Sequence, residues 1–280
     1  MKLKLLKTAL IGAVTFTAIA SGYAQAHARW LMPSHTSLSG EKTHYVMIDA
    51  SISNELFSPD KAYRPKQKGA EYDDNLLIAL APDGKPVEET IRAYYLKRKN
   101  SAAVSLTQDG TYHIAMQQKP MLMTFYKDKD GNRGRVFAGK KEADLPAGAT
   151  DVRTVKSIAT VDTFVSRNGT SKPTLLGQGL EISGPTHPND LFAGEEAKFQ
   201  LLMDGKPAAD VELAIVRGSA RYRNERDEVK VTTDKKGFFT VTFAHADMYL
   251  IEASVDQKPA EADIDNVRYS LFTTLEVAPE

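Results

Sequence analysis

Cysteine is absent from the 280 residues of the chain. This absence excludes disulfides, thiolate metal ligands, iron–sulfur clusters and cysteine nucleophiles. A surplus of charge is absent as well, because 36 Lys and Arg residues are balanced by 36 Asp and Glu residues. A chain without surplus positive charge has little attraction for a phosphate backbone, so nucleic acid is excluded as a partner.

The chain also lacks an apolar run long enough to span a membrane. Its mostly apolar stretch, residues 8–20, has 13 residues, whereas a membrane-spanning helix needs about 20. This stretch follows three lysines and precedes Ala24-Gln25-Ala26, which together form the pattern of a secretory signal peptide. We therefore predict a signal peptide over residues 1–26, export to a bacterial periplasm, and a mature chain of net charge −3 that does not span the membrane.

The mature chain contains many short segments rich in β-branched and aromatic residues, separated by turn sequences such as Pro82-Asp83-Gly84 and Asp109-Gly110. No window of a dozen residues has a clean helical apolar stripe, and residues 151–164 fit a helix or a β-branched strand equally well. The predicted strands of the first half are 45–48, 76–80, 91–96, 103–106, 111–116, and a hairpin of 122–126 with 135–137.

The second half has a more regular alternation of apolar and polar residues. It predicts two strand–turn–strand pairs, 198–203 with 211–216 and 228–233 with 239–243, followed by strands 248–255 and 269–277. About seven strands in roughly 100 residues is the strand count of an immunoglobulin-like sandwich. We predict an all-β fold of two tandem sandwich domains, residues 27–165 and 175–280, joined by a polar linker at 166–174.

Common enzyme signatures are missing: there is no glycine-rich phosphate loop, no Gly-x-Ser-x-Gly and no His-Glu-x-x-His. The chain is therefore not expected to be an enzyme, and its six histidines are the informative residues. Cleavage after Ala26 would leave His27 first, so that its amine and imidazole together could chelate Cu(II) or Ni(II). Cleavage after Ala24 or Ala28, or a disordered terminus, would remove that site.

The remaining histidines each have a structural and a metal-binding interpretation. His35 and His44 are loop and strand-edge residues unless the fold brings one of them to His27. His113 is expected on the outer face of its strand, opposite Tyr112, as an ordinary exposed residue more than as a ligand. His187 lies between two prolines as a structural residue or an interface ligand, and His245 suits a turn. Met116 and Met123 are expected to fill the core more than to bind Cu(I).

Several motifs in order along the chain resemble the bacterial periplasmic domain-of-unknown-function family DUF4198, whose members are often labelled periplasmic components of nickel or cobalt uptake. The matching segments are residues 27–33, 179–181, 186–195, 202–208, 217–223 and 247–253. The C-terminal half also resembles transthyretin-like or carboxypeptidase-regulatory sandwiches. The resemblance implies a soluble periplasmic protein that binds or delivers a divalent metal, with His27 and His187 at positions that match the family pattern.

Two functions from different classes follow. The first is a periplasmic protein that binds a divalent transition metal, nickel or cobalt first and copper second, through His27, His35, His44, His113 and His187. The second is a non-metal interaction module whose partner is an inner-membrane transporter or an outer-membrane receptor. A copper oxidase or monooxygenase is disfavoured, because no second histidine can be assigned opposite His27.

Overall fold

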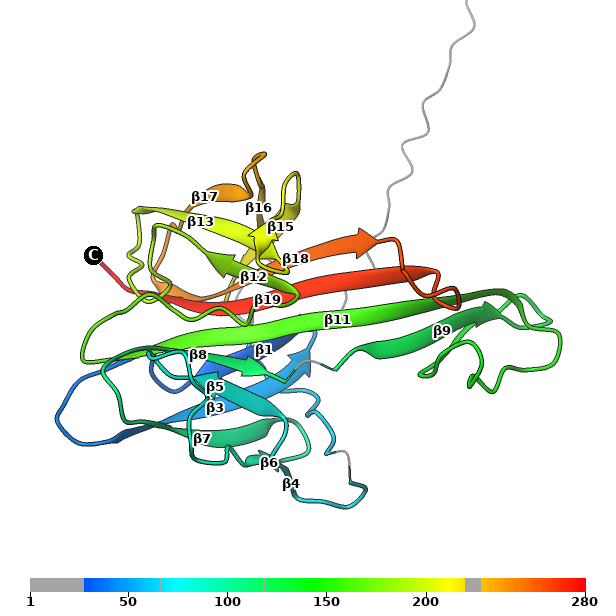
Figure 1. Ribbon diagram of the computed structural model, residues 1–280, viewed down its shortest axis with the longest axis horizontal. Helices are drawn as coiled ribbons and strands as arrows, with labels where there is room; N and C mark the ends of the chain where they lie inside the picture. Colours follow the sequence, from blue (N-terminus) through cyan, green and yellow to red (C-terminus); the bar gives the residue numbers. More distant parts are fainter. Residues whose placement is uncertain (1–27, 66, 118, 220–227) are drawn as a thin grey trace, which may run out of the picture.

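The computed structural model describes residues 28–65, 67–117, 119–219 and 228–280, and all regular secondary structure within these ranges is β-strand (Figure 1). In these ranges there is no helix long and apolar enough to cross a membrane. Residues 151–164, for which helix and strand were both open, belong to one long strand. The predicted all-β class is therefore confirmed.

The first sandwich has the strand order of an immunoglobulin domain. Its strands are β1 (Ala28–Pro33), β2 (Ser37–Leu38), β3 (His44–Ser53), β4 (Tyr72–Asp73), β5 (Leu77–Leu80), β6 (Ala93–Tyr95), β7 (Asn100–Leu106), β8 (Gly110–Met116) and β11 (Thr150–Arg167). One sheet has the order β1-β3-β7-β6-β4, and the facing strands pair as β5-β8-β11. Strands β1-β3-β7-β6 correspond to immunoglobulin strands A-B-E-D, with β4 added beyond D, and β5-β8-β11 correspond to C-F-G. The short β2 pairs in parallel with β11.

The second sandwich has the same kind of order. Its strands are β12 (Leu180–Ser183), β13 (Glu196–Met203), β14 (Lys206–Pro207), β15 (Glu212–Arg217), β16 (Glu228–Thr232), β17 (Phe238–Thr242), β18 (Asp247–Gln257) and β19 (Asn266–Val277). Strands β12, β13 and β17 form one sheet, as A-B-E do, and β16-β15-β18-β19 form the other, as C′-C-F-G do. The chain is thus two immunoglobulin-like sandwiches in succession.

One sheet runs through both sandwiches, because their last strands pair with each other. Residues 155–163 of β11 lie parallel to residues 266–274 of β19, and Figure 1 shows these two long strands side by side across the molecule. The resulting sheet has ten strands. β11 continues to Arg167, so the first two residues of the predicted linker are the end of a strand, and both are buried. The independent folding of the two predicted domains remains a prediction.

Alternate side chains of β11 enter two different hydrophobic cores. Val161 and Val165 belong to the core of the first sandwich, whereas Phe164 belongs to the core of the second. Successive side chains of a strand point to opposite faces. The strand therefore acts as the wall between the two cores, and residues 160–167 are all buried because both faces of the strand are covered.

Each sandwich has a tyrosine near the start of its F strand whose hydroxyl bonds the backbone four residues upstream. The Tyr112 hydroxyl donates to the Gln108 carbonyl at 3.2 Å and accepts the Gln108 N–H at 2.7 Å. The Tyr249 hydroxyl donates to the His245 carbonyl at 2.9 Å. This is the tyrosine corner of immunoglobulin-like domains, and it confirms that the His245 region is a turn.

The two strand–turn–strand pairs predicted for the second half are wrong as pairs, although the strands themselves are present. β13 pairs with β17, and β15 pairs with β16 and β18, so each predicted pair is split between the two sheets. Period-2 alternation marks one buried face of a strand but carries no information on its partner. The chain crosses between sheets at 208–211, after the short β14 has paired with β13, and at 233–237, as it does in immunoglobulin topology.

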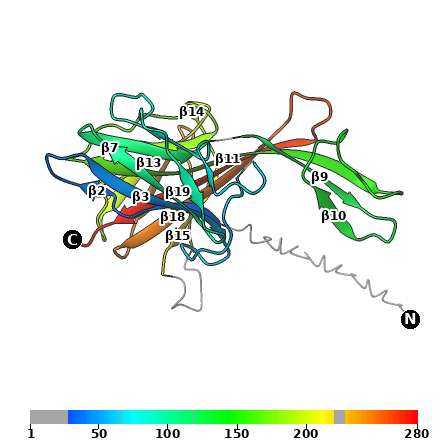
Figure 2. The same ribbon diagram turned by 90° about the horizontal axis from the view of Figure 1, so that it is seen from below.

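The predicted hairpin of the first half is confirmed. β9 (Met121–Lys127) and β10 (Arg133–Val136) pair in antiparallel register and continue the ten-stranded sheet from β11. In Figures 1 and 2 the hairpin lies at one end of the long axis, away from the strands that face each other in the sandwiches. It is an insertion between the F and G strands of the first sandwich.

Candidate functional site

The junction of the two sandwiches contains a fully buried histidine. His113 on β8 is 0 % exposed, so the expectation that it is an ordinary exposed residue is wrong. Its strand position pairs with Phe164 of β11, and the two rings stack with centroids 4.5 Å apart. Alternation does place His113 opposite Tyr112, but the linker and the second sandwich cover that face as well.

Both ring nitrogens of His113 are hydrogen-bonded. Nε2 lies 2.9 Å from Oδ2 of Asp162, and Nδ1 lies 2.7 Å from the carbonyl oxygen of Thr174 in the linker. A carbonyl and a carboxylate are both acceptors, so the ring that satisfies them is the imidazolium with two N–H donors. Burial opposes the charged form, yet the hydrogen bond and charge of Asp162 outweigh it and raise the pKa of His113.

Asp162 connects this ion pair to the second sandwich. Its Oδ1 accepts the hydroxyl of Thr273 on β19 at 2.6 Å, and both side chains are fully buried. The next pair along the same strands adds a bond from the Thr163 hydroxyl to the Thr274 carbonyl at 3.1 Å. The polar chain His113–Asp162–Thr273 therefore crosses the seam between the last strands of the two sandwiches.

A second buried acid lies close to this chain. The carboxylate of Glu181 on β12 accepts the backbone N–H groups of Leu176 and Gly177 at 2.7 and 3.0 Å. Burial raises the pKa of Glu181, while the two backbone donors and the positive charge of His113 oppose that rise. Glu181 thus fixes the end of the linker that carries Thr174.

The linker is also fastened to β8 upstream of Thr174. The Thr111 N–H donates to the Ser171 hydroxyl at 2.9 Å, and the Ser171 N–H donates to the Thr111 hydroxyl at 3.0 Å. Gly110 permits this approach, because a Cβ at its position would lie 2.5 Å from Ser171 Oγ, and its φ is +123°. The linker is a tightly bound segment of the junction.

His187 completes the polar cluster as a neutral residue. Its Nε2 lies 2.9 Å from the carbonyl oxygen of Ser171, which requires a proton on that nitrogen, and its Nδ1 accepts the Asn189 N–H at 3.0 Å. Burial lowers the pKa of His187, although the bond to Ser171 opposes the shift. His187 lies at the interface of the two sandwiches, as one interpretation of its sequence position predicted, and both nitrogens serve the local structure.

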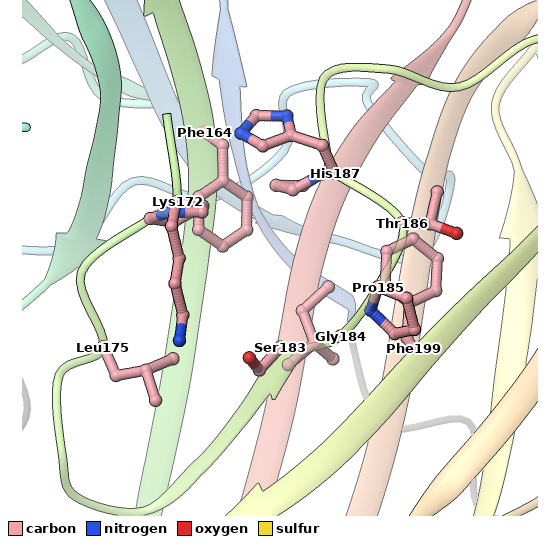
Figure 3. Close-up of a pocket in the computed structure, with 12 residues that line it drawn as sticks. Phe164, Lys172, Leu175, Ser183, Gly184, Pro185, Thr186, His187 and Phe199 are labelled. Atoms are coloured by element: carbon pink, nitrogen blue, oxygen red, sulfur yellow. The ribbon is translucent and has the colours of Figure 1, made fainter. Parts of the chain in front are cut away.

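A pocket of about 270 Å³ opens beside His187 (Figure 3). Its walls are mostly apolar, and its polar side chains are Lys172, Ser183, Thr186 and His187. The apolar walls come from the linker, β11, β12 and β13, through Phe164, Pro173, Leu175, Ile182, Pro185 and Phe199. Lys172 and Leu175 lie on one side and Pro185 and Phe199 on the other. In the described part of the chain, Lys172 makes no ion pair.

The predicted metal-binding histidines do not form a common site in the described structure. The signal peptide, His27 and residues 220–227 lie outside the described residues. His35 is exposed, and its Nδ1 lies 3.2 Å from its neighbour Ser34 Oγ. His44 begins β3, and its Nε2 is buried without a hydrogen-bond partner. Ala28 and Pro33 mark opposite ends of β1, about 17 Å apart at about 3.3 Å per residue, so His35 lies at the far end of that strand from Ala28.

Among the described residues, no three His, Asp or Glu side chains are grouped so that they could hold a metal ion. His113 and His187 are the two predicted residues that the fold brings to one junction, and Thr111 lies between them, bonded to His187 at 3.0 Å. Metal binding by either ring would require breaking a hydrogen bond described above. Met116 packs against the first core as expected.

Asp162 and Glu181 were not identified from the sequence, although a signal was present. Each lies inside an apolar run, Asp162 within 158–165 and Glu181 between Leu180 and Ile182. Acidic residues are almost never fully buried unless paired. An acid at the centre of a β-branched segment is therefore a marker for a buried partner.

A comparison with protein families gives a match over most of the chain. A family model described as "Domain of unknown function (DUF4198)" matches residues 24–257. No curated protein matches the chain. Among solved structures, the D0-D1 domain of intimin is similar at 12% identity and a TM-score of 0.22, covering 89% of this chain and 97% of that one.

Two further structures have similar values. Yersinia pseudotuberculosis adhesin InvE has 12% identity and a TM-score of 0.21, covering 90% of this chain and 61% of that one. Murine CEACAM1b has 9% identity and a TM-score of 0.19, covering 90% of this chain and 100% of that one. At such low TM-scores these likenesses carry no functional information, and the strand order described above defines the fold.

Proposed function

The chain belongs to the DUF4198 family, and we propose that it is a non-enzymatic binding protein that takes a small apolar anion into the pocket at the junction of its sandwiches. The observation that carries the proposal is the amine of Lys172 beside a mostly apolar cavity, with no ion-pair partner among the described residues. An apolar pocket with a few convergent polar groups is the usual form of a small-molecule site.

The size and polarity of the pocket define the ligand class. About 270 Å³ is just below the range of typical ligand pockets, so the ligand is a short alkyl or aryl chain. The aromatic rings of Phe164 and Phe199 favour apolar contact, and Lys172 favours a carboxylate. Because Lys172 itself is exposed, the carboxylate stays at the rim, where its loss of hydration is small.

The surroundings of the pocket support a preformed site. His187 and the linker are held by hydrogen bonds on both sides of the cavity, and Glu181 fixes the linker beyond Leu175. A wall that is already ordered costs little conformational entropy when a ligand enters. Ligand binding at this place also contacts both sandwiches at once.

The surroundings of His113 support a role other than catalysis. His113 and Asp162 resemble the base and orienting acid of a catalytic triad, but the second nitrogen of His113 faces the Thr174 carbonyl and not a nucleophilic hydroxyl. The pair is also sealed from solvent. A structural role for this pair fits a binding protein.

Binding of hexanoate and phenylacetate, measured by calorimetry or by NMR shifts, tests the proposal. Both acids should bind, hexylamine should not, and Lys172→Met should weaken hexanoate binding about fivefold, as expected for one solvent-exposed ion pair. Lys206→Met is a matched control, since Lys206 lies on β14, away from the pocket lining. The assignment would be overturned if neither hexanoate nor phenylacetate bound, or if the Lys172→Met variant bound hexanoate as tightly as the wild type.

A second candidate is metal binding at the predicted mature amino terminus. Ala28 is the first residue of β1, is 4 % exposed and pairs with Ser53. Cleavage after Ala26 would leave His27 as the single residue before an ordered strand, where its amine and imidazole would form a chelate suited to Ni(II) or Cu(II). Such a protein would act in the periplasm, in uptake or handling of the metal with a membrane transporter or receptor.

Titration of the exported protein with Ni(II) tests this second candidate. Affinity should fall as the pH drops through about 6.5, because protons compete for the nitrogens. One extra residue before His27 should weaken binding strongly, since it converts the amine to an amide. Equal affinity with and without the extra residue, or a mature chain that begins elsewhere, would exclude the amino-terminal site and leave the pocket proposal unaffected.

A further inference from the structure

The hairpin of β9 and β10 presents a row of positive side chains on one face. Arg135 of β10 and Arg153 of β11 both lie opposite Phe125 of the intervening strand β9, and Arg133 lies opposite Lys127. Residues directly opposite each other in an antiparallel pair share a face of the sheet. The five side chains Arg133, Arg135, Arg153, Lys127 and Phe125 line one open hollow of about 800 Å³, which we call the arginine face.

The positive charge of the arginine face is only partly compensated. Lys127 pairs with Asp151 at 2.6 Å. The charge of Arg153 contributes to the lowered pKa of Asp256, but the first cause of that shift is the hydrogen bond from Arg268, which binds Asp256 through two nitrogens. Arg133 and Arg135 make no ion pair with any residue that the structure describes. Both are exposed and belong to the outermost strand of the sheet.

Aromatic rings accompany these guanidinium groups. Arg135 lies over the ring of Phe137 at 5.7 Å from the centroid, and Phe137 is 64 % exposed. Tyr126, which also lines the hollow, lies across Gly134 so closely that a Cβ there would overlap its ring. This packing holds β10 against β9 and keeps Arg133 and Arg135 on one side. An arginine held beside an aromatic ring is oriented and less free in solution.

The spacing of the arginines matches an extended polypeptide. Arg133 and Arg135 are alternate residues of one strand, about 6.7 Å apart along it, while Arg135 and Arg153 are about 9.6 Å apart across two strand spacings. A single phosphate or carboxylate is too small to contact this set. Acidic residues at alternate positions of an extended peptide repeat at the same 6.7 Å or so and lie on one face.

The outer edge of β10 can accept such a peptide. β10 is the last strand at its end of the ten-stranded sheet, so its outward backbone groups have no strand partner within the described residues. An extended segment that adds to a sheet edge gains main-chain hydrogen bonds, while its alternate side chains meet those of the edge strand. Exposed edges are commonly protected by positive side chains, and the same charges would favour an acidic segment over a neutral one.

We propose that the arginine face is a docking site for an acidic, extended peptide segment of a partner protein, which adds as a strand to β10 and places alternate Asp or Glu residues against Arg133 and Arg135. The turn at one end of the hairpin carries Asp128 and Asp130 beside Lys129, so it adds no net positive charge to the arginine face. The docked segment therefore lies along β10 toward Phe137. The site is separate from the junction pocket, so either proposal can fail without the other.

Fluorescence anisotropy with two labelled synthetic peptides tests the proposal on the full-length mature protein. One peptide alternates Glu with Val and Thr; the other has the same composition, with its glutamates in one block. The alternating peptide should bind more tightly, and its affinity should fall as salt is raised from 0.05 to 0.5 M. Arg133→Gln and Arg135→Gln should each weaken binding about threefold and together about tenfold, as exposed ion pairs do.

Two controls separate the peptide from other anions and from misfolding. Arg92→Gln removes an arginine that pairs with Asp74 on the first sandwich and should leave the affinity unchanged, and thermal unfolding should be the same in all variants. N-methylation of the peptide amides that face β10 should weaken binding further, because a peptide that adds as a strand uses these N–H groups for its main-chain hydrogen bonds. The proposal would be overturned if the two peptides bound equally well, or if N-methylation left the affinity of the alternating peptide unchanged. It would also be overturned if inorganic polyphosphate displaced that peptide at the same concentration of charge.

Discussion

The junction and the hairpin use ionisable side chains in opposite ways. At the junction, His113, Asp162 and Glu181 are fully buried. Each of them is hydrogen-bonded to a neighbouring strand or to the linker. On the hairpin, Arg133 and Arg135 are exposed and have no ion-pair partner among the described residues. Desolvation makes an unpaired buried charge very costly, whereas an unpaired surface charge costs almost nothing in water.

This difference separates residues that specify the structure from residues that are available for recognition. The junction charges can be satisfied in one arrangement of the two sandwiches, because Asp162 must reach both His113 on β8 and Thr273 on β19. The exposed charges of Arg133 and Arg135 place no constraint on how the two sandwiches are arranged. An acidic group of another molecule could pair with them. Substitutions should therefore affect stability at the junction and binding at the hairpin.

The largest effect is expected from Asp162→Ala. The substitution leaves the imidazolium of His113 buried without its counter-charge and removes the acceptor of the Thr273 hydroxyl. Breaking a buried pair in this way costs about 3–5 kcal/mol of unfolding free energy, which urea denaturation can measure. Asp162→Asn should cost less, because an amide can donate to a neutral imidazole.

A matched substitution beside the hairpin, at the start of β11, makes the contrast quantitative. Asp151→Ala removes an acid that is also paired, with Lys127 at 2.6 Å, but whose side chain is 64% exposed. Because Asp151 has a φ of 52°, which alanine tolerates less well than aspartate, its effect on stability should be up to about 1 kcal/mol, still well below that of Asp162→Ala. Equal losses for Asp151→Ala and Asp162→Ala would contradict the distinction between the two regions.

The second effect is a dependence of stability on pH that originates at the junction. The folded-state pKa of His113 is raised, so its stabilising contribution is complete below about pH 6.5 and is lost as the pH rises through the folded-state pKa. The folded-state pKa of His187 is lowered, so its contribution is lost as the pH falls below about 6.5. His113→Gln should flatten the alkaline side of the stability profile, and His187→Gln the acid side.

Glu181 acts on the same profile at lower pH and serves as an internal check. Its pKa is raised, so stability should decline as the pH rises from about 4.3, the ordinary value, through its folded-state value. Glu181→Gln should remove this part of the decline. Urea denaturation from pH 4 to pH 9 resolves the three contributions, and a wild-type profile that matches that of His113→Gln would show that His113 is not charged in the folded state.

The comparison also explains which features could be predicted from the sequence. Local signals sufficed for most strands, for the hairpin of 122–126 with 135–137, and for the turn before Tyr249. They did not predict the parallel pairing of β11 with β19, because residues 155–163 and 266–274 are far apart in sequence. The alternation of apolar and polar residues does not identify the strand with which a given strand pairs. They also predicted that His113 lies on an exposed face of its strand, because a polar residue within an apolar segment usually indicates a strand with one solvent-exposed face.

The junction site was missed for the same physical reason. Its members come from β8, β11, the linker, β12 and β19, and only the packing of one sandwich on the other brings them together. Asp162 and Glu181 were each visible as an acid within an apolar segment, but their partners were not. Arg133 and Arg135, in contrast, are alternate residues of one strand, so their shared face follows from local strand geometry alone.

A smaller effect is expected at the two tyrosine corners, which compare the sandwiches with each other. Tyr112→Phe removes a hydroxyl that bonds both the N–H and the carbonyl of Gln108, and Tyr249→Phe removes one bond to the His245 carbonyl. A typical hydrogen bond contributes about 1 kcal/mol. Each substitution should therefore lower the unfolding free energy by about 1–2 kcal/mol in urea denaturation, and no measurable loss at either tyrosine would contradict a stabilising role for that corner.

The smallest effect on stability is expected where the largest effect on binding is proposed. The double substitution Arg133→Gln with Arg135→Gln removes two exposed charges from an edge strand and leaves the packing of Tyr126 on Gly134 intact. Because these guanidinium groups have no described ion-pair partner, the unfolding free energy should change by less than about 0.5 kcal/mol. Removing like charges from one strand relieves some repulsion, so the sign should be neutral or slightly stabilising. A loss of 2 kcal/mol or more in urea denaturation would mean that the two arginines support the fold, and their role would then resemble that of Asp162.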